Sequence, residues 1–166
     1  MKTKYKLLLG ISPLVVLIDQ WTKLSVIEHF RVGESIEIIT SYFNLTYVRN
    51  YGAAFGFMAG VDPSVRGPFF VFVPILALIM ISYLFYKLES GQIRAAVSYS
   101  LILAGAVGNN LIDRMLYGYV VDFLDFHWKE VYHWPAFNVA DIAIVVGVSL
   151  MFLDLFQNEN ASGKES

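Results

Sequence analysis

Four stretches of the chain are each long enough and apolar enough to cross a lipid bilayer, and they constrain the fold more than any other feature. They cover about residues 7–27, 68–86, 95–112 and 137–156, and a spanning helix needs about 20 mainly apolar residues. Hydrophobic residues make up 57% of the chain and charged residues only 16%, unlike a water-soluble domain. Because lipid cannot hydrogen-bond an open backbone, we expect a mainly α-helical membrane protein with four transmembrane helices in a single domain, residues 1–166.

The first apolar stretch resembles a secretory signal peptide but lacks a cleavage site. Basic residues precede it, yet its second half continues into Asp19-Gln20-Trp21-Thr22-Lys23 where a cleaved signal would show a small-x-small sequence. We therefore predict that this stretch is retained as the first transmembrane helix.

Positive charges indicate which ends of the helices face the cytoplasm. Lys2, Lys4 and Lys6 precede the first stretch, and Lys87 and Arg94 lie in the link between the second and the third. Short cytoplasmic segments are enriched in Lys and Arg, and four spans return the chain to the side on which it began. Both termini are therefore predicted to be cytoplasmic.

The segment between the first two stretches, residues 28–67, is predicted to lie outside the cytoplasm. Residues 35–39 and 43–48 alternate like short β-strands, and residues 51–60 combine small and aromatic side chains that suit a turn or helix at the membrane interface. We expect a small extracytoplasmic β-platform and an interfacial helix. The run from Gly52 to Gly56 could close over a substrate as a lid, or the whole segment could be a rigid platform that only anchors the protein.

Several polar side chains stand directly against the apolar stretches, where an ionised or unpaired group is costly. Asp19 and Lys23 are four residues apart on a helix and can form an ion pair, although Lys23 could instead extend toward lipid headgroups or a substrate. Asn138 and Asp141 are three apart and share a helix face, and a helix N-terminus stabilises negative charge there. Asp141 could also serve only as a capping acid.

A pair of carboxylates is the chemistry that these acids suggest. Asp122 lies in the apolar sequence Val-Val-Asp-Phe-Leu, where a solvated acid is not expected, but spacing gives Asp125 an equal claim. Two carboxylates close together in a low-dielectric site cannot both ionise easily, so they share a proton. Such a pair, completed by Asp141, can hydrolyse an amide: one carboxylate takes a proton from the attacking water, and the other, protonated, polarises the carbonyl and later helps the amine to leave.

The sequence lacks the motifs of other common catalytic mechanisms. It has no cysteine, no nucleotide-binding glycine loop and no serine-hydrolase or zinc-protease motif, and its net charge of −2 offers no basic footprint for nucleic acid. His127, His133 and Asp122 could form a metal cluster, but aromatic-flanked histidines at an interface are more often structural, so we expect no metal and no cofactor. Arg114 beside Asp113 is most simply a salt bridge, with a phosphate or lipid contact as the alternative.

Five separated motifs in this order resemble the bacterial signal peptidase II family, the lipoprotein signal peptidases. They span nearly the whole chain and are Asp19-Gln-Trp-Thr-Lys23, Asn50-Tyr-Gly-Ala-Ala-Phe55, Asn110-Leu-Ile-Asp113-Arg114, Gly118-Tyr-Val-Val-Asp122-Phe and Phe137-Asn138-Val-Ala-Asp141.

The resemblance implies an intramembrane aspartic endopeptidase with a catalytic pair formed by Asp122 and Asp141. The residues implied to bind substrate or brace the site are Asp19, Lys23, Asn50, Asn110, Asp113, Arg114 and Asn138. The family pattern is Gly-Asn-x-x-Asp-Arg, whereas here Gly108 is followed by both Asn109 and Asn110. We choose Asn110, because its spacing to Asp113 matches the pattern.

The implied reaction is cleavage of a prolipoprotein just before its diacylglyceryl-modified cysteine, by a monomer in the bacterial inner membrane with its active site near the outer face. Membrane lipid is the other expected partner. The alternative function is a small proton- or ion-coupled carrier, since intramembrane Asp, Asn and Lys also mark transport paths. Four spans without an internal repeat suit a carrier poorly.

Overall fold

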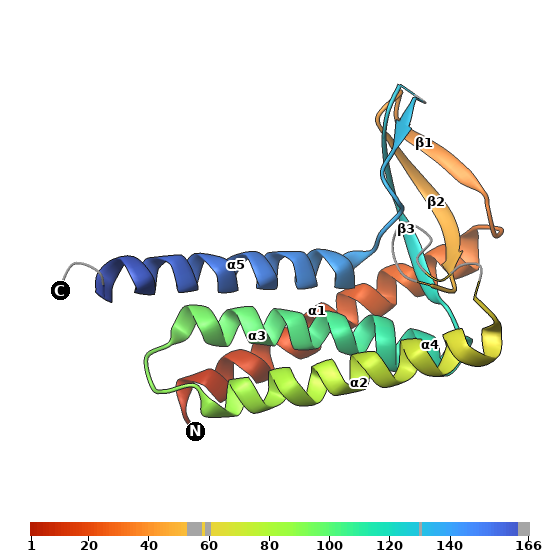
Figure 1. The fold of residues 1–166 in the computed structure, drawn as a ribbon. Coiled ribbons are helices and arrows are strands. Elements are labelled where there is room, and N and C mark those ends of the chain that lie inside the picture. Colours follow the sequence, from red (N-terminus) through yellow and green to blue (C-terminus); the bar gives the residue numbers. More distant parts are fainter. Residues whose placement is uncertain (53–57, 59–60, 130, 163–166) are drawn as a thin grey trace.

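A computed structural model of the chain describes residues 1–52, 58, 61–129 and 131–162. Its helices are α1 (Thr3–His29), α2 (Pro63–Lys87), α3 (Ile93–Ala106), the π-helix η2 (Val107–Asp113), α4 (Arg114–Tyr117) and α5 (Val139–Ser162). Within the described residues four helical stretches are long and apolar enough to cross a membrane: Thr3–His29, Ser64–Lys87, Ile93–Tyr117 and Val139–Gln157. The prediction of four spans is confirmed, and both termini lie at the same end of the helices (Figure 1).

The helix α3 packs between α1 and α5 because small residues let the backbones approach closely. A Cβ added at Gly147 of α5 would lie 2.8 Å from the backbone oxygen of Ser98 on α3, and one at Gly108 of η2 would lie 2.7 Å from an Asp19 carboxylate oxygen on α1. These glycines bring the polar residues of α1 and η2 within reach of the start of α5.

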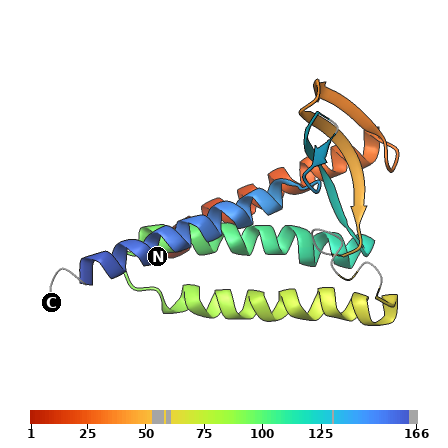
Figure 2. The same ribbon diagram turned by 45° about the horizontal axis from the view of Figure 1, so that its top comes forward.

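The helix α2 stands apart from this packed trio (Figure 2). Only 6% of its apolar window is buried inside the protein, against 56% for the window that begins with α3. Most of the surface of α2 is therefore left to contact lipid.

The part outside the helices is a four-stranded antiparallel sheet in the order β1-β2-β3-β4. Its strands are β1 (Ser35–Ile39), β2 (Phe43–Asn50), β3 (Val120–Trp128) and β4 (Tyr132–His133). The two strands predicted at 35–39 and 43–48 are confirmed, while β3 and β4 come from a segment for which no strand was predicted. The strands run across the direction of the helices, at the end opposite both termini (Figure 1).

A small core joins the sheet to α1 and fixes the start of β3. It contains Val26 of α1, Tyr47 of β2, and Val121 and Phe123 of β3. Successive side chains of a strand point to opposite faces, so the residue between the two core positions of β3, Asp122, points away from this core. The predicted interfacial helix falls mostly on residues 53–57 and 59–60, outside the described residues.

Candidate active site

Asp122 is held in a defined position on β3 by two amide side chains. Its Oδ2 accepts a hydrogen bond from Asn50 Nδ2 at 2.9 Å, and its Oδ1 accepts one from Asn138 Nδ2 at 2.8 Å. The residue is only 3% exposed. Asn50 and Asn138, which the resemblance implies to bind substrate or brace the site, thus both contact Asp122.

Asp141 lies in the first turn of α5 and forms a capping box with Asn138. The Asp141 N–H donates to Asn138 Oδ1 at 3.0 Å, while the Asn138 N–H donates to Asp141 Oδ2 at 3.0 Å. A reciprocal pair of this kind satisfies two helix-end donors. The capping role considered for Asp141 is thus real, but Asn138 also ties the same carboxylate to Asp122, so both acids are held around one asparagine.

Behind the two acids lies a buried polar hub formed by Asp19, Lys23, Asp113 and Asn109. Lys23 Nζ lies 2.8 Å from Asp19 and 2.9 Å from Asp113, and donates to Asn109 Oδ1 at 2.6 Å. The side chain of Lys23 is 2% exposed and both carboxylates are fully buried. The predicted Asp19–Lys23 ion pair is confirmed, and an extension of Lys23 toward lipid is not what the structure shows.

Each carboxylate of the hub accepts the backbone N–H that immediately precedes one of the two site acids. Asp19 Oδ1 accepts from Ala140 N at 2.9 Å, next to Asp141. Asp113 Oδ2 accepts from Val121 N at 3.1 Å, next to Asp122. The hub therefore sets the position of both acids through the backbone.

The structure corrects the choice between the two neighbouring asparagines. Asn109 is the residue of the site: its Nδ2 donates to Asp141 Oδ1 at 2.8 Å, and its Oδ1 also accepts from Asn138 Nδ2 at 3.0 Å. The choice of Asn110 assumed α-helical spacing, whereas residues 107–113 form a π-helix with a wider turn. In that turn Asn109 and Asp113, four residues apart, both reach Lys23.

Sequence reasoning also missed one member of the site and misassigned another. Gln20 Nε2 donates to Asp19 at 3.1 Å and to Asp113 at 2.9 Å, and its position beside Asp19 in a motif was the available signal. The predicted Asp113–Arg114 salt bridge is wrong, because Asp113 pairs with Lys23. Arg114 instead donates to the backbone oxygen of Gly52 at 2.7 Å, and its guanidinium carbon lies 4.8 Å from the ring centre of Phe70.

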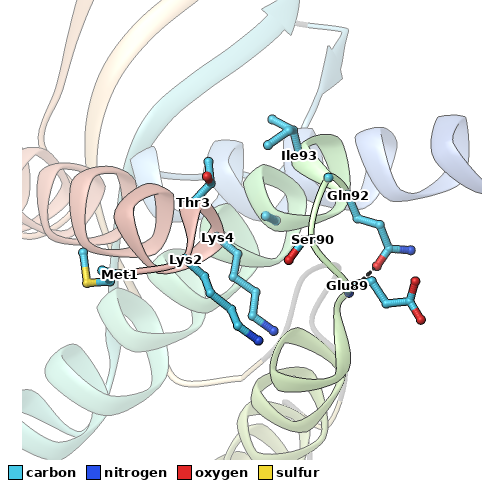
Figure 3. A pocket seen from close by; sticks show the side chains of 10 residues that line it. Met1, Lys2, Thr3, Lys4, Glu89, Ser90, Gln92 and Ile93 are labelled. Carbon is cyan, nitrogen blue, oxygen red and sulfur yellow. Dashed lines mark hydrogen bonds between the residues drawn. The ribbon is translucent and has the colours of Figure 1, made fainter.

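Both acids open onto a mainly apolar cavity of about 500 Å³. Besides Asn50, Asp122 and Asp141 it is lined by the segment 134–137 and by one face of α5, which carries Ile142, Ile144, Val145 and Val146. A smaller cavity of about 190 Å³ lies at the opposite end of the helices, between Met1–Lys4 and residues 89–93, and it holds no pair of acids (Figure 3).

Burial and the negative charge of Asp141 raise the pKa of Asp122 to about 7, while the hydrogen bonds from Asn50 and Asn138 act in the opposite direction. A carboxylic acid with this pKa is part protonated at neutral pH. The site can therefore present one protonated and one ionised carboxyl group together, as acid–base hydrolysis requires.

The structure distinguishes the surroundings of Asp122 from those of Asp125, which sequence spacing alone could not do. The two are three residues apart on β3 and so point to opposite faces of the strand. Asp125 accepts a hydrogen bond from Thr46 Oγ1 at 3.3 Å and lies 3.6 Å from His133 Nδ1.

The proposed cluster of Asp122 with the two histidines does not form. His127 stacks on His133 with ring centres 4.9 Å apart, beside Asp125 and not beside Asp122. Over the described residues, no group of three His, Cys, Asp or Glu side chains could hold a metal ion. The predicted lid falls mostly on residues 53–57, which the structure does not describe.

Comparisons with known proteins show what the whole chain is similar to. The model of the signal peptidase (SPase) II family matches residues 11–157. A lipoprotein signal peptidase of Geobacter metallireducens is 46% identical over 166 residues, with full coverage of both chains, and one of Pasteurella multocida is 46% identical over 152 residues, or 92% of this chain and 90% of that one. A solved structure of a bacterial membrane enzyme matches with a TM-score of 0.80 and 36% identity, covering 92% of this chain and 88% of its own.

Proposed function

The chain belongs to the signal peptidase II family and removes signal peptides from prolipoproteins, and we propose that it does so as an aspartic endopeptidase with Asp122 and Asp141 as its catalytic pair. One observation carries the proposal. Both carboxylates line the same cavity and are held by the same residue, Asn138.

The surroundings of the two acids support different roles for them. Asp141 accepts hydrogen bonds from the Asn138 N–H and from Asn109, at the positive end of α5, so it serves as the ionised base that takes a proton from the attacking water. Asp122, with a pKa of about 7, serves as the protonated acid. It donates its proton to the carbonyl oxygen as water attacks. When the C–N bond breaks, the hydroxyl group formed from the carbonyl returns a proton to Asp122, and Asp141 passes the proton taken from water to the departing amine.

The cavity suits a substrate that is half peptide and half lipid. Its polar end holds the two acids, and its wall of Ile142, Val145 and Val146 belongs to the lipid-exposed part of α5. A diacylglyceryl-modified cysteine, anchored in the bilayer by its acyl chains, would bring the peptide bond before it to the acids. Cleavage just before that cysteine releases the signal peptide.

The same proposal includes the orientation in the bacterial inner membrane. Lys2, Lys4 and Lys6 lie at the end of the bundle that holds both termini, which we assign to the cytoplasm, and the acids lie near the other end (Figure 1). Substrate and water therefore meet at the outer face. None of the comparisons favours the carrier alternative.

The test is an assay of purified protein in detergent with a lipid-modified prolipoprotein, followed by the mass of the product. Asp122→Asn and Asp141→Asn should each abolish cleavage, because an amide keeps the shape and cannot exchange the proton. Asp125→Asn is the matched control on the opposite face of β3 and should retain most activity. Near-normal turnover by either of the first two variants would refute the catalytic pair.

A further inference from the structure

An exposed aromatic cluster occupies the free end of the sheet, far from the helices. We call it the hairpin tip: Tyr42, Trp128, Val131, Tyr132 and Trp134. Trp128 is 60% exposed, Tyr132 63% and Val131 85%. Trp128 faces Tyr132 across the β3–β4 pair, and its ring centre lies 5.2 Å from that of Tyr42.

The hairpin tip continues one apolar face of the sheet. The strand register pairs Leu45 with Leu124 and Phe43 with Phe126 on this face. The opposite face carries the pairs Asn44 with Asp125 and His127 with His133. Because side chains alternate along a strand, the apolar face runs along β3 from Trp128 to the base of the strand, where Asp122 lies.

The sheet lies at the end of the spanning helices that is opposite both termini. Its strands run across the helices in both ribbon views, so a sheet attached to spanning helices extends along the membrane surface (Figures 1 and 2). In both views the β3–β4 side is the side nearer α5, and the lower part of β1 lies farthest from it. The hairpin tip is thus on the side of the sheet that faces the bilayer.

We propose that the hairpin tip inserts into the boundary between headgroups and acyl chains of the outer leaflet and anchors the sheet there. Trp and Tyr are the residues that collect at this boundary, because their rings are apolar and their N–H or O–H groups remain hydrated. Lys129 stands exposed in the turn beside Trp128, where its ammonium group can reach lipid phosphate. The partner is therefore phospholipid.

The anchor is connected to the wall of the cavity that holds the two acids. Trp134 N donates to Phe126 O at 2.9 Å, and Phe137 N donates to Leu124 O at 3.1 Å, so the segment 134–137 is bound to β3. The Phe126 ring also stacks between those of Phe43 and Phe137, with centres 4.6 and 5.7 Å away. Lipid contact at the tip thereby fixes the height of this wall above the bilayer; this last step rests on the proposed function.

The anchor is tested by tryptophan fluorescence of the full chain in nanodiscs of phosphatidylcholine and phosphatidylglycerol. The chain has three tryptophans, Trp21, Trp128 and Trp134. The double variant Trp21→Phe/Trp134→Phe leaves Trp128 alone, and Trp128→Phe/Trp134→Phe leaves Trp21 on α1 as the lipid-exposed reference. Lipids brominated near the headgroup end should quench Trp128 strongly, and aqueous iodide should quench it weakly. Strong quenching by iodide together with no quenching by brominated lipid would overturn the proposal, and would be the result if the tip met a soluble protein surface instead.

A kinetic test follows the consequence for cleavage. Trp128→Ser/Tyr132→Ser should raise KM for the lipidated substrate about fivefold in nanodiscs with kcat nearly unchanged, since about 1 kcal/mol of positioning is lost. Ile36→Ser, at an exposed residue near the start of β1, is the control and should leave both constants unchanged. Equal KM values for the tip variant and the parent protein in nanodiscs would refute the proposed effect of the hairpin tip on the cavity. The fluorescence measurement does not depend on turnover, so it tests the membrane anchor independently of the catalytic pair.

Discussion

Lys4 and Lys23 are two buried lysines on the same helix, and their surroundings differ completely. Lys4 Nζ donates to the backbone oxygens of Phe85, Tyr86 and Leu88 at 3.2, 2.7 and 2.7 Å, and so closes the C-terminal end of α2 beside the smaller cavity (Figure 3). Lys23 lies between two buried carboxylates. One lysine satisfies the partial charges of a helix end, and the other neutralises full charges.

The difference shows what each end of the protein is built for. Removing Lys4 would leave carbonyl groups at a helix end that water can reach, which is a limited cost. Removing Lys23 would leave Asp19 and Asp113 as uncompensated buried charges, and these two residues hold the backbone beside Asp141 and Asp122. The end that we assign to the cytoplasm therefore joins helices, whereas the outer end positions the proposed catalytic pair.

Replacing Lys23 should give the largest effect at the outer end. Lys23→Met should lower kcat/KM more than about a hundredfold and reduce the free energy of unfolding by about 3 to 5 kcal/mol, the usual cost of breaking a buried pair. Cleavage assays and thermal unfolding in detergent measure the two effects. Turnover within tenfold of the parent protein would show that the hub does not position the acids.

The two asparagines of η2, Asn109 and Asn110, allow a comparison of a site residue with its direct neighbour in a single helical turn. Asn109→Ala should lower kcat by about ten- to a hundredfold, because Asp141 and Lys23 each lose a charge-assisted hydrogen bond. Asn110→Ala is the matched control and should stay near the parent rate. Equal losses in both variants would contradict the assignment of Asn109 to the site.

Raising the pH should lower activity by removing the proton from Asp122. Its pKa is raised in the folded protein to about 7, so the proton that catalysis needs is held below this pH and lost above it. Measured kcat should therefore fall about tenfold per pH unit well above 7. The same shift stabilises the folded state at acidic pH and is lost as the pH rises through about 7; Asp122→Asn should remove this part of the pH dependence of unfolding. A rate that stays constant from pH 6 to about 9 would contradict the role of Asp122 as the acid.

Replacing Lys4 should give the smallest effect on cleavage. Lys4→Met should lower the melting temperature by a few degrees, as expected for a helix-end cation worth about 2 kcal/mol, and leave turnover within about twofold. Lys6→Met removes a neighbouring lysine without such contacts and serves as the control. A loss of turnover as large as that of Lys23→Met would end the distinction between the two lysines.

Hydropathy was enough to predict the number of spans but not where they end. The observed helices reach beyond the predicted windows because charged residues continue them: Lys4 extends α1, and Arg114 begins α4 after η2. Such residues lower a hydropathy average even when their charges are satisfied inside the protein. The predicted apolar windows are therefore shorter than the observed helices.

Local sequence was less informative about the site, because its decisive contacts join distant segments. The pair Asp19–Lys23 could be predicted from four-residue spacing, and Asp122 was separated from Asp125 by family resemblance alone. No sequence signal marks residues 107–113 as a π-helix, so the register that brings Asn109 inward was not predictable. The hydrogen bond from Val121 N to Asp113 depends on strand β3, which had not been predicted.

The hydrogen bond from Ala140 N to Asp19 links positions 121 residues apart, in the first and the last spanning helix of the chain. Synthesis runs from the N-terminus, so the acceptor enters the membrane long before its donor exists. A nascent chain that stops before α5 lacks Asp141 and the amide of Ala140 that donates to Asp19. The proposed catalytic pair therefore forms only when the final helix docks, after the other spanning helices have been synthesised.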